Sequence, residues 1–199
     1  MFSIKRTKDT DDLVKMLSLL REYFEPYEIV SSNEFIYYVG NYSKLYDGED
    51  YFAYKIESSE TLVGMMSGVK LKEFVSIDYL VIRKEYRRYT KEIASKLFKI
   101  LNEFKLPIIL EAETEALCRL YRSQGFKQFS EHYQYVMLQV DLVNKTSKTL
   151  IHDSHLMYLS NTLLDFEQTR DTLYRKHYYR WNSIYGEQYL TEYKKALGL

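Results

Sequence analysis

The segment Ile77–Leu101, IDYLVIRKEYRRYTKEIASKLFKIL, decides the fold of this chain. It opens with the β-branched and aromatic residues expected of a buried strand, which includes Leu80, Val81 and Ile82. A basic turn follows. Apolar residues then recur at the i, i+4, i+7 and i+8 spacing of an amphipathic helix, at Ile93, Leu97, Ile100 and Leu101. The segment therefore predicts a strand that runs through a basic turn into a helix.

Further strands are predicted on both sides of this segment. The runs DYFAYKI (50–56), TLVGMMSGVKL (61–71) and EFVSIDYLVI (73–82) are separated by short polar stretches, which indicates an antiparallel meander. After the helix, KLPIILEAE (105–113) reads as a short apolar strand opened by Pro107. Because a helix connects it to YLVI, we expect these two strands to be parallel.

The remaining pattern adds helices and two outer strands. We expect a strand at FSIKR (2–6), a helix from Thr10 toward Pro26, and a helix at EFIYYVGNYSKLY (34–46). TEALCRLYRSQ (114–124) predicts a helix that ends at Gly125, and HYQYVMLQV (132–140) alternates like a last strand. The predicted fold class is α/β (α+β), with a mixed, mostly antiparallel sheet flanked by helices, plus C-terminal helices.

Composition limits the function classes. The 199 residues suit one domain with an extension, and 28 basic against 28 acidic residues leave no global field that favours nucleic acid. A single cysteine, Cys118, excludes an internal disulfide and a cysteine-based metal site, and we expect no metal. There is no apolar run of about 20 residues and no secretory signal after Met1, so we expect a cytoplasmic protein without a membrane partner.

The basic turn is a candidate anion site. Unpaired N–H groups and the helix dipole make a helix N-terminus attractive to phosphate. Between Arg83 and Lys99 there are seven basic and two acidic residues, although the whole chain is neutral. The alternative is a solvated basic corner that holds no ligand.

Two motifs in this order resemble the GNAT family of acyl-CoA-dependent N-acyltransferases. They are LVIRKEYR (80–87), a strand that leads into the basic turn, and LYRSQGF (120–126), a helix end followed by glycine and phenylalanine. The resemblance covers roughly residues 1–140. It implies a GNAT-like acyltransferase domain over 1–140 and leaves 141–199 as a C-terminal extension, whose apolar spacing predicts helices.

The resemblance also implies the cofactor residues. Acetyl-CoA would be the cosubstrate, with its pantetheine arm along Leu80, Val81 and Ile82. Its pyrophosphate would bind at the turn formed by Arg87, Arg88, Tyr89, Thr90, Lys91, Glu92, Ile93 and Ala94. The turn departs from the family pattern because Thr90 and Glu92 occupy the two small-residue positions. In a loop about two residues longer, Ala94 would be the small residue.

Catalysis needs an acid for the leaving thiolate and a base for the amine. The resemblance places the general acid at Tyr121, for which the alternative is an ordinary core tyrosine. For the base we favour Asp78 in the central strand. Glu111, Glu113 and an ordered water remain alternatives, and the acidic run at 111–115 would also suit the start of the following helix.

The C-terminal extension, residues 141–199, is called the tail below. Its sequence places one apolar stripe along a predicted helix, comprising Phe166, Leu173, His177, Trp181 and Ile184. The stripe can pack on the main domain or on a second copy of the chain, which would make a homodimer. YRKHYYRW (174–181) interleaves aromatic and basic residues, but helical spacing distributes them around the cylinder, so we do not expect nucleic acid.

The sequence therefore predicts an N-acetyltransferase that moves an acetyl group from acetyl-CoA to a small-molecule or peptide amine. The alternative is a non-catalytic binding protein with the same fold, which the glycine-free turn favours.

Overall fold

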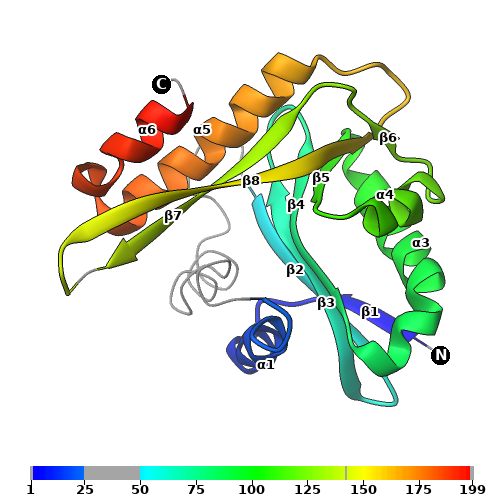
Figure 1. The fold of residues 1–199 in the computed structure, drawn as a ribbon. Helices are drawn as coiled ribbons and strands as arrows, with labels where there is room; N and C mark the ends of the chain where they lie inside the picture. Colours follow the sequence, from blue (N-terminus) through cyan, green and yellow to red (C-terminus); the bar gives the residue numbers. More distant parts are fainter. Residues whose placement is uncertain (1, 25–49, 142, 198–199) are drawn as a thin grey trace.

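The protein is a three-layer structure in which helices cover both faces of one mixed sheet (Figure 1). The computed structural model describes residues 2–24, 50–141 and 143–197, apart from the side chains of Ser183 and Ile184. The predicted helix at 34–46 lies outside these residues. Helices α3 and α4 cover one face of the sheet, whereas α1 lies on the other side (Figure 1).

From β1 to α4 the described elements follow the predicted order, whereas β6 and β8 were not predicted. The strands are β1 (Phe2–Arg6), β2 (Asp50–Ser58), β3 (Thr61–Lys70), β4 (Val75–Ile82), β5 (Ile108–Ala112), β6 (Lys127–Gln128), β7 (Tyr133–Asp141) and β8 (Thr146–Leu159). The α-helices are α1 (Thr10–Leu20), α3 (Thr90–Leu101), α4 (Glu115–Arg122), α5 (Phe166–Tyr185) and α6 (Thr191–Leu197). Short 3₁₀ helices occupy η2 (Lys84–Tyr89), η3 (Asn102–Phe104) and η4 (Glu187–Tyr189).

The sheet order is β1-β2-β3-β4-β5-β8-β6, with β7 paired to β8. Strands β2 to β4 form the predicted antiparallel meander, and β1 pairs antiparallel with β2 at its edge. The predicted parallel pairing of β4 with β5 is also confirmed. None of the helices in the described ranges is long and apolar enough to cross a membrane.

Apolar periodicity accounts for the packing of the helices. On α3, Ile93, Leu97 and Leu101 are fully buried against the sheet, together with Cys118 of α4. Burying each such side chain contributes about 1.5 to 3 kcal/mol relative to leaving it exposed. Gly125 has a φ of +92° after α4, which is the left-handed conformation that glycine adopts without strain.

The tail is not helical throughout, and the expectation of helices across residues 141–199 is wrong for β8. This strand of 14 residues pairs with β7 along Thr146–Ser154 and then with β5 along His155–Leu159. Its sequence, TSKTLIHDSHLMYL, carries little alternation because only Leu156, Met157 and Tyr158 are buried. Pairing with two partner strands stabilises it instead.

Helices α5 and α6 cover the ribbon formed by β7 and β8 (Figure 1). Of the predicted stripe, Phe166, Leu173, His177 and Trp181 are buried, and the side chain of Ile184 lies outside the description. Trp181 packs with Val136, Leu138, Leu190 and Tyr193 in a separate small core. The apolar face that suggested a dimer is thus covered within the chain.

A β-bulge in β4 shapes the centre of the sheet. Ser67 of β3 pairs with Tyr79 and Gly68 pairs with Ile77, so Asp78 is the extra residue and has no partner on β3. A Cβ on Gly68 would lie 2.1 Å from the carbonyl oxygen of Ser76. Close contact between the two backbones at the bulge therefore requires glycine at position 68.

We predict that Gly68→Ala destabilises the protein by roughly 1 to 3 kcal/mol, because the two strands must separate to admit the methyl group. Thermal unfolding measures the effect. Ser67→Ala adds no atoms at the neighbouring position and should lower the midpoint by much less. An unchanged midpoint for Gly68→Ala would contradict the close approach at the bulge.

Candidate active site

The site begins where β4 and β5 separate. In the described chain their parallel ladder consists of two pairs, Val75 with Ile108 and Ser76 with Ile109. The bulge at Asp78 follows directly and turns the rest of β4 away from β5. From Ile77 to Ile82, the edge of β4 that faces β5 therefore has no strand partner among the described residues.

A cavity of about 180 Å³ occupies this split. It contains both residues that the sequence analysis nominated for catalysis, Asp78 and Tyr121. Residues from β4, β5, α4, β7, β8 and α5 line it, including Leu80, Glu111, Glu113, Tyr135, His152, Lys176, His177 and Arg180. The structure thus brings together the predicted acid, three candidate bases and a wall contributed by the tail.

Asp78 is held by two cations from α5. Its Oδ1 lies 2.8 Å from Nζ of Lys176, and its Oδ2 lies 3.4 Å from a guanidinium nitrogen of Arg180. Lys176 also donates to the Ser76 hydroxyl at 3.0 Å. All three charged side chains are nearly buried, and each carboxylate oxygen of Asp78 has one cation beside it. Asp78 is therefore engaged as an ion-pair partner.

Glu111 has a different environment. Its carboxylate accepts a short hydrogen bond from the hydroxyl of the buried Tyr133 and faces the cavity. Burial raises the pKa of Glu111 to about 7, against the smaller opposing effects of the Tyr133 hydrogen bond and the Lys176 charge. A carboxyl group that titrates near neutrality can accept a proton at physiological pH.

Tyr121 has the properties of a proton donor. It lies on α4 with 7% of its surface exposed, and its ring packs against Phe98 and Phe126 at centroid distances of 6.2 and 5.7 Å. Burial raises the pKa of the Tyr121 phenol to about 12. The hydroxyl group is therefore protonated at neutral pH, and Tyr121 is one of the residues that line the cavity.

The predicted cofactor turn differs from an open glycine-rich loop. Lys84–Tyr89 form a 3₁₀ helix that continues directly into α3. The N–H and the hydroxyl of Thr90 both bond to the carbonyl oxygen of Arg87, the hydroxyl at 2.7 Å. Glu92 pairs with Lys96 at 2.7 Å. The N–H group of Thr90 at the start of α3 is thus already bonded within the chain, whereas at a free helix N-terminus it would be open to a ligand.

The side chains of this turn divide into two groups. Val81, Ile82, Ile93 and Ala94 are buried in the core, so they can meet a ligand only through backbone atoms. Arg87, Arg88, Lys91 and Glu92 are exposed. A shallow hollow beside α3 is lined by Arg88, Tyr89, Lys91, Glu92, Ser95, Ser123 and Gln124. It joins the start of α3 to the end of α4.

Sequence reasoning missed several residues of this cavity. Lys176 and Arg180 were read only as basic residues of the run YRKHYYRW, and their contacts with β4 span about half of the chain. Tyr133, which does not line the cavity but bonds to Glu111, was read only as part of a strand. His177 lies edge-on to Tyr135, with ring centroids 5.4 Å apart. Burial, followed by the charges of Lys176 and Arg180, lowers the pKa of His177 well below its usual value.

These features define the class of fold. The chain has the GNAT fold, as the motifs predict. Strand β4 contains a bulge and splits from β5, helix α3 connects these two strands, and β8 pairs with β5 to extend the sheet.

Comparison with solved structures gives the same fold. A protein from Bacteroides thetaiotaomicron assigned to the GNAT family of acetyltransferases superposes with a TM-score of 0.65 and 19% identity, over 94% of this chain and 98% of its own. The ribosomal-protein-S18-alanine N-acetyltransferase of Escherichia coli gives 0.56 and 14%, over 83% and 97%. A chimeric spermidine N-acetyltransferase built on the Vibrio cholerae protein gives 0.56 and 17%, over 79% and 95%. No family profile and no curated protein sequence matches the chain.

The raised pKa of Glu111 gives a prediction about stability. A carboxyl group with a raised folded-state pKa stabilises the fold while it is protonated, and this contribution is lost as the pH rises through about 7. Glu111→Gln is neutral at every pH and can still accept from Tyr133. The thermal midpoint of the variant relative to wild type should therefore rise between about pH 5 and pH 8.

Thermal unfolding at a series of pH values measures this difference. Glu131→Gln, the same change at an exposed position outside the cavity, is the matched control, and any pH-dependent difference that it shows is subtracted. A flat corrected profile for Glu111→Gln would show that burial does not govern the ionisation of Glu111.

Proposed function

We propose that the protein is an acyl-CoA-dependent N-acetyltransferase that acts on a primary amine of a small molecule or peptide. One observation carries the proposal: the cavity at the split between β4 and β5 is lined both by Glu111, which titrates near neutrality, and by the protonated phenol of Tyr121. A carboxyl group that can accept a proton near neutral pH and a phenol that still carries one are the two partners that acid–base chemistry needs.

The donor half of the site fits acetyl-CoA. The free edge of β4 beyond Ser76 offers backbone N–H and C=O groups to an extended amide-containing arm, as an added strand would use them. Arg87, Arg88 and Lys91 would hold the pyrophosphate near the hollow between α3 and α4 by charge-assisted hydrogen bonds. When bound, acetyl-CoA supplies an acetyl thioester whose carbonyl carbon is open to attack by an amine.

The residues of the cavity divide the proton transfers. Glu111 accepts the proton that the acceptor nitrogen loses as it forms the new amide bond, and Tyr121 donates its phenolic proton to the departing sulfur. Asp78 was favoured as the base from sequence. We now assign it a positioning role, because Lys176 and Arg180 already occupy its carboxylate oxygens.

A non-catalytic binding protein with this fold is the second candidate. The observation in its favour is the structure of the turn. A 3₁₀ helix forms its first part, and Thr90 and Glu92 occupy the two positions where the family has small residues. Side chains there limit close approach of a phosphate to the backbone, and the Glu92 carboxylate repels it.

Calorimetric titration with acetyl-CoA tests the donor assignment. We expect wild type to bind, and Arg87→Ala combined with Arg88→Ala to weaken binding by about 1 to 3 kcal/mol, because two charge-assisted contacts are lost. Lys99→Ala removes one exposed cation from the last turn of α3 and should leave the affinity unchanged. If wild type does not bind acetyl-CoA, the acetyltransferase proposal fails and the second candidate stands.

Substitution of Tyr121 by Phe tests the acid role. The ring packing remains and only the hydroxyl is lost, so acetyl-CoA affinity and the thermal midpoint should change little while turnover falls by at least about 10². Slow hydrolysis of acetyl-CoA is the first assay, followed by an amine acceptor selected from a panel.

Tyr54→Phe is the control for this substitution, because Tyr54 is equally buried but lies on β2 away from the cavity. Equal turnover by wild type and Tyr121→Phe with a true acceptor would make Tyr121 a structural core residue.

A further inference from the structure

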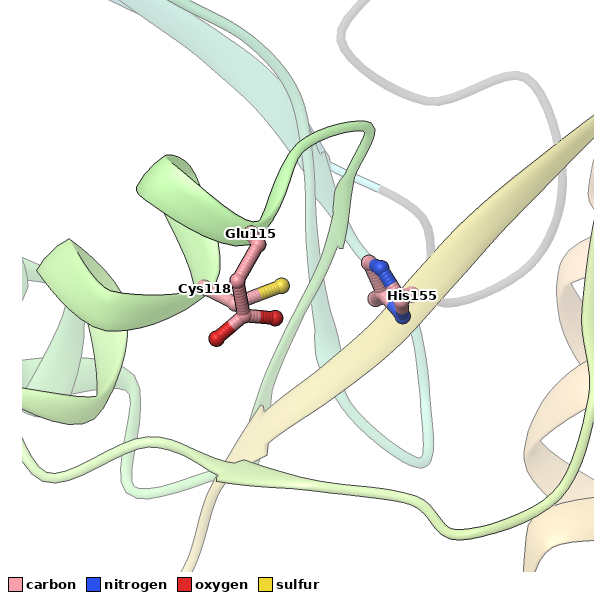
Figure 2. A group of neighbouring side chains, drawn as sticks. All are labelled: Glu115, Cys118 and His155. Carbon is pink, nitrogen blue, oxygen red and sulfur yellow. The ribbon is translucent and has the colours of Figure 1, made fainter.

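A second cluster of reactive side chains lies outside the candidate active site. Glu115 and Cys118 of α4 and His155 of β8 each offer one ligand atom, and these atoms all lie within 4.8 Å of one another. Figure 2 shows the two helix side chains and the imidazole ring gathered between α4 and β8. None of the three residues lines the cavity that holds Tyr121 and Glu111.

Local structure explains why they meet. Glu115 and Cys118 are three residues apart on α4, so they lie one helical turn apart on the same face. Thr114 caps this helix by accepting from the N–H of Leu117, which fixes where the first turn begins. On β8, Ser154 lines the cavity, and His155, as the next residue along the strand, points to the opposite face toward α4.

We propose that Glu115, Cys118 and His155 form a binding site for a divalent transition metal, with Zn²⁺ the ion that suits it best. The sequence, with its single cysteine, predicted no metal, because a site built on several cysteines is excluded. A mixed site is not, since one thiolate, one imidazole nitrogen and one carboxylate oxygen are the three ligand types that Zn²⁺ takes in proteins. Three protein ligands leave a fourth tetrahedral position, which the exposed side of Glu115 opens to water. Binding converts the Cys118 thiol to a thiolate and releases its proton to solvent.

The neighbouring residues supply the outer contacts that such a site needs. The amide nitrogen of Gln128, on β6, lies 3.1 Å from Nδ1 of His155. The amide oxygen of Gln128 accepts a hydrogen bond from the Arg122 guanidinium at 2.6 Å. Arg122 also bonds to Glu115 at 2.8 Å. A histidine ligand typically has its second ring nitrogen held by such a partner, which fixes the orientation of the ring.

Only a small rearrangement is required. The Glu115–Arg122 pair is exposed on both sides, and exposed ion pairs contribute little to stability, so Glu115 can exchange Arg122 for a metal ion. Release of Arg122 also frees the Gln128 amide to rotate. Its oxygen can then accept from Nδ1–H of His155, which leaves Nε2 as the metal ligand.

The site has a consequence for the cavity at the split between β4 and β5. Helix α4 carries Leu117 and Tyr121 into that cavity, and β8 carries His152 and Ser154. A metal ion bound by Glu115, Cys118 and His155 would join these two elements directly. It would act as a structural cross-link that fixes Tyr121 relative to β8, and would not touch the reacting groups.

The first experiment uses wild-type protein without a histidine tag, dialysed against a chelator. Calorimetric titration with ZnCl₂ should show one ion bound per chain, with a rise in the thermal midpoint. Titration with CoCl₂ should produce the near-ultraviolet charge-transfer absorption of a cobalt–thiolate bond. This readout needs no substitution and no enzymatic activity. Binding without that absorption, or no binding, would overturn the proposal.

Variants assign the ligands. His155→Ala and Cys118→Ser should each abolish the cobalt–thiolate band or weaken Zn²⁺ binding more than Gln128→Ala, which removes only an outer contact and should cost about 10- to 100-fold in affinity. His155 is half-buried, so its substitution is safe for folding even where the buried Cys118 is not. His152→Ala is the matched control, because His152 is exposed and three residues away on the same strand. Equal affinity in wild type and His155→Ala, or loss of binding in His152→Ala, would contradict the assignment.

Discussion

The extra residue in β4 is the constraint on which the rest of the structure depends. At this β-bulge, Asp78 lies between Ile77 and Tyr79, which pair with the adjacent residues Gly68 and Ser67 of β3. Glycine at position 68 lets the two backbones approach closely there. The strand beyond the bulge twists away from β5 and exposes its hydrogen-bonding edge. Without this irregularity the parallel ladder would continue, and side chains of the two strands would fill the space where the cavity now lies.

The same residue connects the tail to the sheet. Asp78 is ion-paired with Lys176 and Arg180 of α5, and the three side chains are almost entirely removed from solvent. A buried ion pair of this kind adds little net stability, but loss of one partner leaves an uncompensated charge in the interior. The pairs therefore fix the position of α5 on the sheet. Because α5 also contributes His177 and Trp181 to the cavity, that position determines the shape of the site.

Local sequence patterns predicted most of the helices and strands. The features that the sequence did not reveal depend mostly on contacts between residues far apart in the chain. The spacing of Ile93, Leu97 and Leu101 predicted α3, and the glycine after LYRSQ predicted the end of α4. The ion pair between Asp78 and Lys176 joins residues 98 positions apart, and nothing in either neighbourhood signals it. Strand β8 was missed because it is mostly exposed, so its sequence lacks alternation and its stability comes from β5 and β7.

The sequence could name Asp78 and Glu111 only as alternative candidates for the base. Asp78 and Glu111 both lie on central strands, and their residue types do not distinguish an ion-pair partner from a proton acceptor. Their surroundings differ, since Asp78 meets two cations, whereas burial raises the pKa of Glu111 to about 7. The turn at residues 84–90 shows the same dependence on context. Side chains replace glycine there, so an anion would be held mainly by exposed, hydrated arginines and lysine, with fewer fixed amides to assist. The proposed acetyl-CoA site would therefore depend more heavily on the free edge of β4 for the rest of its affinity, and that edge exists because of the bulge at Asp78.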